Sequence, residues 1–302
     1  MPKVSVIIPS YNCSAFVAEA VDSVLIQNQT MPDYEIIVID DGSSDNTREV
    51  LEPYFSRSHF RYIRQQNRGL PGARNSGVRA SDSEYLAFLD ADDALAPNAL
   101  ELMTAELDAS GAGWCLIDIL KVGSQLHEVR RTVIPDGDLH LEILRDDFVR
   151  RGMFFRRKTF VAVGMYDERM RYREDWDINI RMFERREPFA YIGQPLYVYT
   201  WREGSITTGN HAKLLYYTEQ VLRKHHKRLA DAGDRRVAKI YAYNMWDLGR
   251  RYFYLVRDYK QAVACMRESL AYDLNLGRML HPLLHHLRRL PGSVGTSADS
   301  QP

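Results

Sequence analysis

The sequence has few cysteines and no long hydrophobic run. Its three cysteines, Cys13, Cys115 and Cys265, are widely spaced and odd in number, so neither a disulfide framework nor a Cys-x-x-Cys zinc site is indicated. Unpaired cysteines are typical of a reducing compartment, and we expect a cytoplasmic protein. No segment approaches the roughly 20 consecutive apolar residues of a membrane-spanning helix, and the first residues lack the regions of a signal peptide. We therefore expect a chain that neither spans a membrane nor is exported.

Two common nucleotide-binding motifs and an overall charge are also absent. No G-x-x-x-x-G-K-[ST] or G-x-G-x-x-G pattern occurs, which counts against a P-loop enzyme and a dinucleotide dehydrogenase. The 40 basic and 40 acidic residues cancel, and we expect no nucleic-acid partner. The charge is unevenly distributed, because residues 1–209 carry 24 basic and 32 acidic residues, whereas residues 210–302 carry 16 and 8. This asymmetry indicates an acidic, metal-using body joined to a basic tail able to rest on an anionic surface.

Short apolar runs alternate with segments of helical periodicity along the first 120 residues. This alternation predicts a doubly wound α/β sheet, in which ligands bind at the carboxyl ends of the strands. Residues 121–209 mix strand-like and helical pieces, and the chain beyond residue 210 reads as helical, with one helix pair near residues 248–266. Residues 291–302 are rich in Gly, Ser and Pro and are expected to be disordered. The expected strands are residues 4–8, 35–39, 60–64, 85–89 and 114–120.

Polar clusters follow three of these strands. They are Pro9-Ser10-Tyr11-Asn12, Asp40-Asp41-Gly42-Ser43 and Asp90-Ala91-Asp92-Asp93. Polar groups that converge on one edge of a sheet favour a binding site over scattered loops.

The cluster Asp90-Ala91-Asp92-Asp93 points to a metal ion. Three carboxylates at the end of a buried strand repel one another unless a cation compensates them. Mg²⁺ or Mn²⁺ is usually shared between one or two protein carboxylates and the phosphates of a substrate. The alternative is a helix start, with Asp93 as N-cap of the helix that begins near Pro97.

Six segments occur in a recognisable order and together resemble the family 2 glycosyltransferases. These enzymes have the GT-A fold and move a sugar from a nucleotide donor to an acceptor hydroxyl, so the resemblance implies an inverting, metal-dependent transferase using Mn²⁺ or Mg²⁺. The segments are VSVIIPSYN (4–12), VIDDGSSD (38–45), NRG (67–69) with ARNSG (73–77), FLDADD (88–93), VGMYDE (163–168) and ED (174–175).

The resemblance also implies residue roles on the donor side. Tyr11 would stack on the base and Asp41 would accept from the pyrimidine N–H, although Asp40 could take either role and Tyr11 could be a core aromatic. Arg74 would pair with phosphate or with a carboxylate of the metal cluster. Asp93 would be the main metal ligand, Asp92 would contact ribose or metal, and Asp90 would be structural. The donor-binding set implied in this way is Pro9, Tyr11, Asn12, Asp41, Asn67, Gly69, Arg74, Asp92 and Arg202.

The ED pair supplies the candidate catalytic base. Asp175 matches the position of the base in the resemblance, and Glu174 is the alternative. Trp176 could form a sugar-stacking wall or belong to the core. The residues Asp177, Arg181 and Arg185, at helical spacing, are expected to form surface salt bridges rather than to take part in chemistry.

One position departs from the family pattern. Arg202 stands where many relatives carry His, and it cannot bind a metal because a guanidinium has no free lone pair. It could still contact phosphate directly.

The resemblance implies a nucleotide-sugar-binding half (1–120) and an acceptor-binding half (121–209). The helical extension (210–290) and the disordered tail (291–302) lie outside the resemblance and are expected from the pattern and composition of the chain. We expect a UDP-sugar donor and a saccharide or lipid-linked saccharide acceptor in bacterial surface polysaccharide or glycoconjugate synthesis. The alternatives are a catalytically silent scaffold subunit and a sugar nucleotidyltransferase. A basic amphipathic segment at residues 279–302 could pack on the body or touch the inner face of a membrane peripherally.

Overall fold

The computed structural model describes residues 2–29, 31, 33–124, 126–149, 154–202 and 210–274. The chain divides into two compact units, residues 1–225 and 226–302, which are considered separately.

Within the described residues, nine strands form one sheet in unit 1, in the order β3-β2-β1-β4-β8-β6-β9-β5, with β7 paired to β6. Strands β1, β2, β3 and β4 are parallel, and β1 and β2 are buried along their whole length, which explains their continuous apolar sequence. The strands are β1 Val4–Ser10, β2 Tyr34–Asp40, β3 Phe60–Arg64, β4 Tyr85–Phe88, β5 Ala94–Leu95, β6 Trp114–Gly123, β7 Leu126–Arg130, β8 Phe154–Arg156 and β9 Phe189–Thr200.

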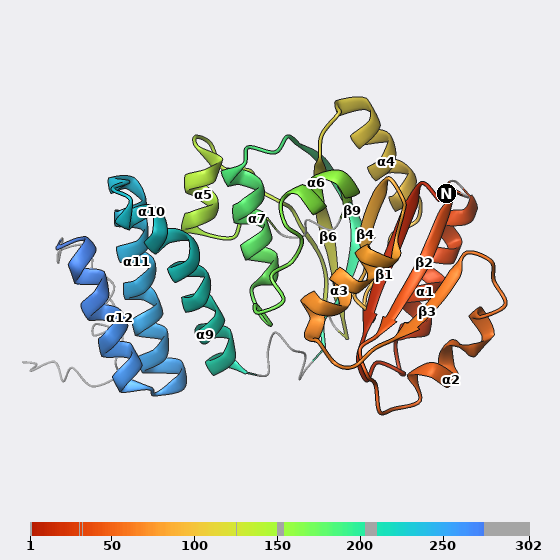
Figure 1. Ribbon diagram of the computed structural model, residues 1–302, viewed down its shortest axis with the longest axis horizontal. Helices are drawn as coiled ribbons and strands as arrows, with labels where there is room; N and C mark the ends of the chain where they lie inside the picture. Colours follow the sequence, from red (N-terminus) through yellow and green to blue (C-terminus); the bar gives the residue numbers. More distant parts are fainter. Residues whose placement is uncertain are drawn as a thin grey trace, which may run out of the picture. The chain divides into compact units, whose positions relative to one another are not determined.

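Helices connect the parallel strands and cover both faces of the sheet (Figure 1). The strand order reverses between β1 and β4, so right-handed crossovers place α3 on the face opposite α1. Helix α3 packs closely because a Cβ atom at Gly77 would lie 2.3 Å from Cγ2 of Ile7 on β1. The helices of this half are α1 Val17–Leu25, α2 Thr47–Leu51, α3 Gly69–Ala80 and α4 Ala99–Ser110.

The second half of unit 1 adds antiparallel pairs to the sheet, since β8 runs against both β4 and β6. Its core is aromatic: the rings of Phe155 and Phe160 lie 4.9 Å apart, and Trp114 stacks on Phe155. The mixed strand directions explain why residues 121–209 show no simple alternation in sequence. The helices of this half are α5 Leu139–Arg145, α6 Arg157–Ala162, α7 Glu174–Glu184 and α9 His211–Val221.

Unit 2 is helical, as expected. Helix α10 (Arg228–Asp231) precedes α11 (Arg235–Arg251), a π-helical turn η4 (Tyr252–Val256) and α12 (Tyr259–Tyr272). Helices α11 and α12 pack closely at Gly249, where a Cβ atom would meet the Ala262 carbonyl oxygen at 2.9 Å. Among the described residues, no helix combines the length and apolar character needed to cross a bilayer.

The fold expected from the sequence is confirmed: an α/β sheet of GT-A type with a helical C-terminal region. The boundaries at 120, 209 and 290 stay predictions. The compact division falls at residues 225 and 226, beyond 209, because Lys224 and His225 pair with Asp177 of α7. The expected disordered tail and the segment 279–302 lie outside the described residues.

Candidate active site

The three polar clusters meet at one edge of the parallel sheet. Ser10 at the end of β1 is in register with Asp40 at the end of β2, and β4 lies on the other side of β1. The turn after β1 is fixed to the turn after β2, since the Asn12 amide donates to Ser43 Oγ at 3.0 Å and Asn12 Oδ1 accepts from the Ser44 amide at 2.8 Å. The strand-order reversal between β1 and β4 lies at this edge, which is where doubly wound sheets bind ligands.

Asp40 and Asp41 have different partners. Asp40 is buried and accepts from the Ser43 amide at 2.8 Å and from the Tyr62 hydroxyl. Asp41 Oδ1 accepts from the Gln65 side-chain amide at 2.7 Å and from the Arg68 backbone amide at 2.8 Å. Its Oδ2 accepts from the Gly69 backbone amide at 2.8 Å. Asp41 therefore fixes the start of α3 beside the end of β2.

The remaining donor-side residues of this edge differ in exposure. Tyr11 is 52% exposed, so it is available for stacking and is not a core aromatic. Asn67 is exposed and Pro9 is buried within β1.

Arg74 of α3 joins the cluster after β4 to the ED pair of α7. Its guanidinium is fully buried; Nη2 donates to Asp90 Oδ1 at 2.7 Å, and Nη1 lies 3.0 Å from Glu174 Oε1 and 3.1 Å from Asp175 Oδ1. The ring of Tyr166 lies 5.2 Å from the guanidinium carbon. One buried cation thus compensates carboxylates from two distant segments, and Asp90 serves as its anchor.

Glu174 and Asp175 are unequal candidates for a base. The side chain of Asp175 is 42% exposed, whereas that of Glu174 is 8% exposed. Burial, with a further contribution from the neighbouring Asp175 charge, raises the pKa of Glu174 to about 8. A buried carboxyl with a raised pKa is a poorer proton acceptor at an open site than an exposed carboxylate, so exposure and charge favour Asp175 as the base.

The predicted metal ligands Asp92 and Asp93 lie side by side in sequence but in different environments. Asp93 is buried; its Oδ2 accepts from the Tyr197 hydroxyl at 2.7 Å and its Oδ1 from the Thr200 amide at 2.8 Å. The side chain of Asp92 is 40% exposed, and its Oδ2 lies 3.9 Å from Arg202 Nη1.

The carboxylates of Asp92 and Asp93 could bind a divalent ion, but they do not form a complete coordination shell. Within the described part of the chain, no group of three or more His, Cys, Asp or Glu residues is arranged around a common point. The residues fit a hard ion held by one or two carboxylates and completed by substrate oxygens. Asp92 presents the more accessible carboxylate for such an ion.

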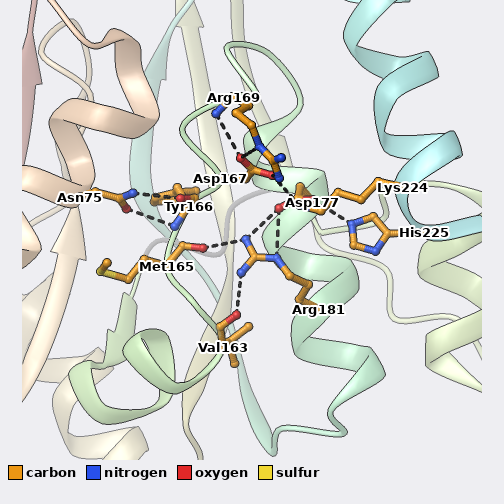
Figure 2. A network of polar contacts seen from close by, with 10 residues as sticks. All are labelled: Asn75, Val163, Met165, Tyr166, Asp167, Arg169, Asp177, Arg181, Lys224 and His225. Atoms are coloured by element: carbon orange, nitrogen blue, oxygen red, sulfur yellow. Dashed lines mark hydrogen bonds and ion pairs between the residues drawn. The ribbon is translucent and has the colours of Figure 1, made fainter. Parts of the chain in front are cut away.

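A buried polar network holds the start of α7 in place (Figure 2). Arg181 donates to the carbonyl oxygens of Val163 and Met165, both at 2.7 Å, and pairs with Asp177 at 2.8 Å. Burial alone would raise the pKa of Asp177, yet His225 at 2.8 Å, Arg181 and Lys224 hold it well below its usual range. The expectation of a surface salt bridge was wrong for Asp177, which is fully buried.

Trp176, the residue between the ED pair and Asp177, is a core residue. It is buried, and its indole N–H donates to the Ile143 carbonyl oxygen at 2.8 Å. It therefore does not form a sugar-stacking wall.

Sequence reasoning named Glu168 only as part of the VGMYDE segment, without its contacts, and missed Tyr197 altogether. Glu168 accepts from Arg68 and Arg79, and thereby ties the segment before α7 to both ends of α3. Tyr197 donates to Asp93 and accepts from the Asp90 amide at 3.2 Å. No local sequence pattern predicts these contacts, because the Arg68–Glu168 and Tyr197–Asp93 pairs are separated by 100 and 104 positions.

Comparison with known protein families gives one match over the part of the chain that carries this site. A family model described as glycosyl transferase family 2 matches residues 5–166.

Curated relatives match at moderate identity. An uncharacterized glycosyltransferase, EpsJ of Bacillus subtilis, is 32% identical over 68% of this chain and 63% of its own length. The chondroitin synthase of Escherichia coli is 43% identical over 35% of this chain and only 15% of its own length. A GalNAc(5)-diNAcBac-PP-undecaprenol beta-1,3-glucosyltransferase of Campylobacter jejuni is 28% identical over 91% of this chain and 90% of its own length. The chain thus spans less than two thirds of the first two relatives.

Solved structures share the fold at low identity. The S. aureus TarS fragment 1–349, in complex with UDP-GlcNAc, has a TM-score of 0.70 at 19% identity, covering 95% of this chain and 87% of that one. The Pyrobaculum calidifontis mannosyltransferase PcManGT, in complex with GDP-Man and Mn²⁺, has a TM-score of 0.57 at 17% identity, covering 96% and 81%. At these identities the likeness concerns the fold alone.

Proposed function

The chain belongs to glycosyl transferase family 2, and from this premise we propose that it is an inverting enzyme that moves a sugar from a nucleotide-diphosphate sugar to an acceptor hydroxyl. The observation that carries the proposal is the set of ion pairs that Arg74 makes, which we call the Arg74 hub. It joins Asp90 of the predicted donor motif to Asp175, the candidate base. A donor site and a proton acceptor held by one rigid group are what a displacement at the anomeric carbon needs.

On the donor side, the nucleotide lies along the carboxyl ends of β1, β2 and β4. Tyr11 stacks on the base, and Asp41 accepts from its N–H while its other contacts hold α3. Pro9, Asn12, Asn67 and Gly69 shape the same edge. UDP is the proposed nucleotide, and the TarS fragment, a structural neighbour solved in complex with UDP-GlcNAc, supports this choice.

On the acceptor side, Asp175 takes the proton of the attacking hydroxyl. The acceptor oxygen forms a bond to the anomeric carbon on the face opposite the diphosphate. The bond from that carbon to the diphosphate oxygen breaks, and its electron pair leaves with the nucleoside diphosphate. Arg74 fixes Asp175 Oδ1 and leaves the exposed side of the carboxylate toward the acceptor.

A Mn²⁺ or Mg²⁺ ion, when bound, would supply Lewis-acid stabilisation of the leaving diphosphate. Asp93, the main ligand expected from the sequence, and the more exposed Asp92 would hold it. Asp93 also fixes the end of β9 through Tyr197 and Thr200.

The acceptor we propose is a saccharide or lipid-linked saccharide in the synthesis of a bacterial surface polysaccharide or glycoconjugate. The C. jejuni relative, which is named for an undecaprenol-linked saccharide and aligns over 91% of this chain, supports this class.

A lipid-linked acceptor would require contact with a membrane, and we propose an aromatic patch of unit 2 for it. The patch consists of Phe253, Tyr254, Leu255, Tyr259 and Val263, whose exposure ranges from 43% to 56%. Residues 250–263, the stretch that contains the patch, also carry four basic residues and one acidic residue. Aromatic and basic side chains together are typical of surfaces that enter anionic lipid headgroups. The segment 279–302, to which the sequence pointed, lies outside the described residues.

A donor screen tests the proposed activity. Purified protein is incubated with UDP-, GDP- and dTDP-sugars and Mn²⁺, and release of the nucleoside diphosphate is measured. A second assay, with a nucleoside triphosphate and a sugar phosphate as substrates, measures pyrophosphate release and tests for a nucleotidyltransferase. Release from a UDP-sugar that Asp175→Asn abolishes supports the proposal. Protein that binds no nucleoside diphosphate by calorimetry would be the scaffold subunit instead.

A further inference from the structure

Asp147 is a further carboxyl group beside the candidate base Asp175. It follows α5, the helix that contacts the start of α7 through the hydrogen bond from the Trp176 indole to the Ile143 carbonyl oxygen. Its Oδ1 accepts a 3.2 Å hydrogen bond from the side-chain amide of Asn179, which is buried in α7. Asp147 is thus held against α7 by a donor that is itself fixed.

The geometry of α7 places Asp147 on the side of Asp175 away from Glu174. Residues four positions apart in a helix lie one above the other, so Asn179 and its partner Asp147 lie close to Asp175. Glu174, one position before Asp175, projects about 100° away in the other direction. Arg74 binds Glu174 on that side. The opposite side of the Asp175 carboxylate is therefore bordered by Asp147.

The electrostatics also place the two carboxyl groups near each other. Burial raises the pKa of Asp147 to about 7, and the charge of Asp175 adds to the rise, whereas the Asn179 hydrogen bond and the Arg173 guanidinium act in the opposite direction. Asp147 is partly exposed, and its Oδ2 accepts no hydrogen bond from the residues that the structure describes. This oxygen is therefore available to a ligand.

An aromatic pair borders the same region. The rings of Tyr172, three residues before Asp175, and Tyr217 of α9 stack with their centroids 5.6 Å apart. Arg173 Nε donates to Oγ1 of Thr218, the residue after Tyr217, at 3.1 Å, and so holds α9 beside the start of α7. Both rings are partly exposed. Exposed aromatic rings can pack against the C–H face of a sugar, so a saccharide suits this surface.

From these contacts we propose that Asp147 is an acceptor-binding residue that determines which saccharides are used: its Oδ2 pairs with a second hydroxyl of the acceptor sugar while Asp175 takes the proton of the attacking hydroxyl. The inference rests on the proposed function, sugar transfer to a saccharide hydroxyl. A hydroxyl donates to a carboxylate and accepts from a carboxylic acid, so both protonation states of Asp147 bind it. The second contact orients the acceptor, and a sugar without this hydroxyl leaves the Asp147 carboxyl unpaired.

The test measures UDP release from a UDP-sugar with octyl β-glycosides of glucose, galactose, GlcNAc and GalNAc as acceptors. Asp147→Ala should raise the KM of the acceptor about 10- to 100-fold, as expected for a lost hydrogen bond to a charged group. Its affinity for UDP, measured by calorimetry, should change by less than about 3-fold. Asp147→Asn, whose amide oxygen can still accept from Asn179, should give a smaller rise in KM.

Deoxy analogues of the glycoside that serves as acceptor test for direct contact. One analogue, other than the one that lacks the attacked hydroxyl, should have a KM about 10-fold or more above that of the parent glycoside in the wild type. In Asp147→Ala, this analogue and the parent should have equal KM values. A merely structural role of Asp147 would weaken all analogues alike.

Asp146→Ala serves as the matched control, because Asp146 is the adjacent aspartate and is exposed, and its replacement should leave the acceptor KM unchanged. Thermal unfolding of each variant separates loss of binding from loss of folding. An unchanged acceptor KM in Asp147→Ala, or the same loss for each deoxy analogue in wild type and variant, would overturn the inference and leave the proposed function standing. UDP release that none of the glycosides accelerates would also overturn the inference. A wild type that neither binds UDP nor releases it from a UDP-sugar would overturn both.

Discussion

Asp175 accepts a 3.1 Å hydrogen bond from Arg74, although the two residues are 101 positions apart in the chain. The same guanidinium binds Asp90 at 2.7 Å, so the predicted donor motif and the candidate base share one buried cation. These contacts fix Asp90 and Asp175 relative to each other without a ligand. Substitutions in this cluster should therefore have different effects. Replacing the exposed Asp175 should lower the rate of sugar transfer, and replacing the buried Arg74 should lower the stability of the fold.

Asp175→Asn is expected to lower sugar transfer by about 10²- to 10⁴-fold, the usual contribution of general base catalysis. The amide can still accept from Arg74, so UDP affinity and thermal stability should stay close to the wild type. Initial rates at saturating donor measure the effect. Glu174→Gln is the control: because Glu174 holds a proton at neutral pH, its variant should keep most of the activity at pH 7. If Glu174→Gln is the inactive variant instead, the alternative base is the correct one.

Arg74→Met is expected to destabilise the protein by about 3 to 5 kcal/mol, because it leaves the Asp90 carboxylate without its buried cation and Glu174 without a hydrogen-bond donor. Urea unfolding measures the loss. Arg79→Met is the matched variant on the same helix, since Arg79 is 47% exposed and its ion pair with Glu168 should contribute less than about 1 kcal/mol. Equal losses in both variants would mean that the hub does not support the fold.

The sequence predicted the parallel half of the fold well because its signals are local. Continuous apolar runs such as residues 4–8 and 35–39 can only be buried on both faces, and the polar turns that follow them mark the ligand edge. Asp41 and Arg74 were proposed as site residues because they belong to ordered motifs. The acceptor half was harder, since β8 pairs antiparallel with β4 and β6 from a distant position in the chain.

Burial was the property that sequence patterns predicted least well. Asp177 and Arg181 have the spacing of a surface pair, and nothing near them in sequence announces Lys224 or His225 as partners. The same holds for Asp93, whose contacts with Tyr197 and Thr200 come from the far end of β9. A carboxylate motif thus predicts a site but does not tell which of its members faces solvent.

Glu174 should make stability depend on pH. Its pKa in the folded state is about 8, above the ordinary value of 4.5, so between these values the folded state binds more protons than the unfolded state. The resulting stabilisation is fully present below pH 4.5 and is lost as pH rises through 8. Between pH 5 and pH 8, the free energy of unfolding should fall in the wild type by at least about 1 kcal/mol more than in Glu174→Gln. Denaturant unfolding at both pH values measures the difference, and Glu84→Gln, at an exposed position, should keep the wild-type slope. Parallel slopes for the wild type and Glu174→Gln would contradict the prediction.

Asp92→Asn and Asp93→Asn should separate metal binding from structure. Asp93 uses both carboxylate oxygens as acceptors, so an amide nitrogen there would face the Thr200 amide or the Tyr197 hydroxyl and cost about 1 to 3 kcal/mol of stability. Asp92→Asn should leave the unfolding temperature unchanged and weaken the effect of Mn²⁺ on UDP affinity. A Mn²⁺ titration of UDP binding and thermal unfolding measure the two effects. A stable Asp93→Asn variant that has lost its response to Mn²⁺ would instead favour Asp93 as the main ligand.

The aromatic patch of unit 2 should decide whether the protein binds membranes. The rings of Tyr254 and Tyr259 each lie 5.0 Å from the ring of Phe253, and all three side chains are exposed, so they form a continuous apolar surface. We expect the whole chain to co-sediment with vesicles that contain anionic phospholipid and only weakly with neutral phosphatidylcholine vesicles, because basic residues flank the patch. The double variant Tyr254→Ser with Leu255→Ser should lose most of this binding.

The control for that variant is Tyr243→Ser, since Tyr243 is a 65% exposed tyrosine of α11 outside the patch and its replacement should leave sedimentation unchanged. Salt adds a second readout, because the electrostatic part of the binding should weaken as ionic strength rises whereas the apolar part should not. Vesicle binding that both variants retain would assign membrane contact to another surface. A patch variant that is monomeric where the wild type is dimeric, with no vesicle binding in either, would identify the patch as a contact between copies of the chain.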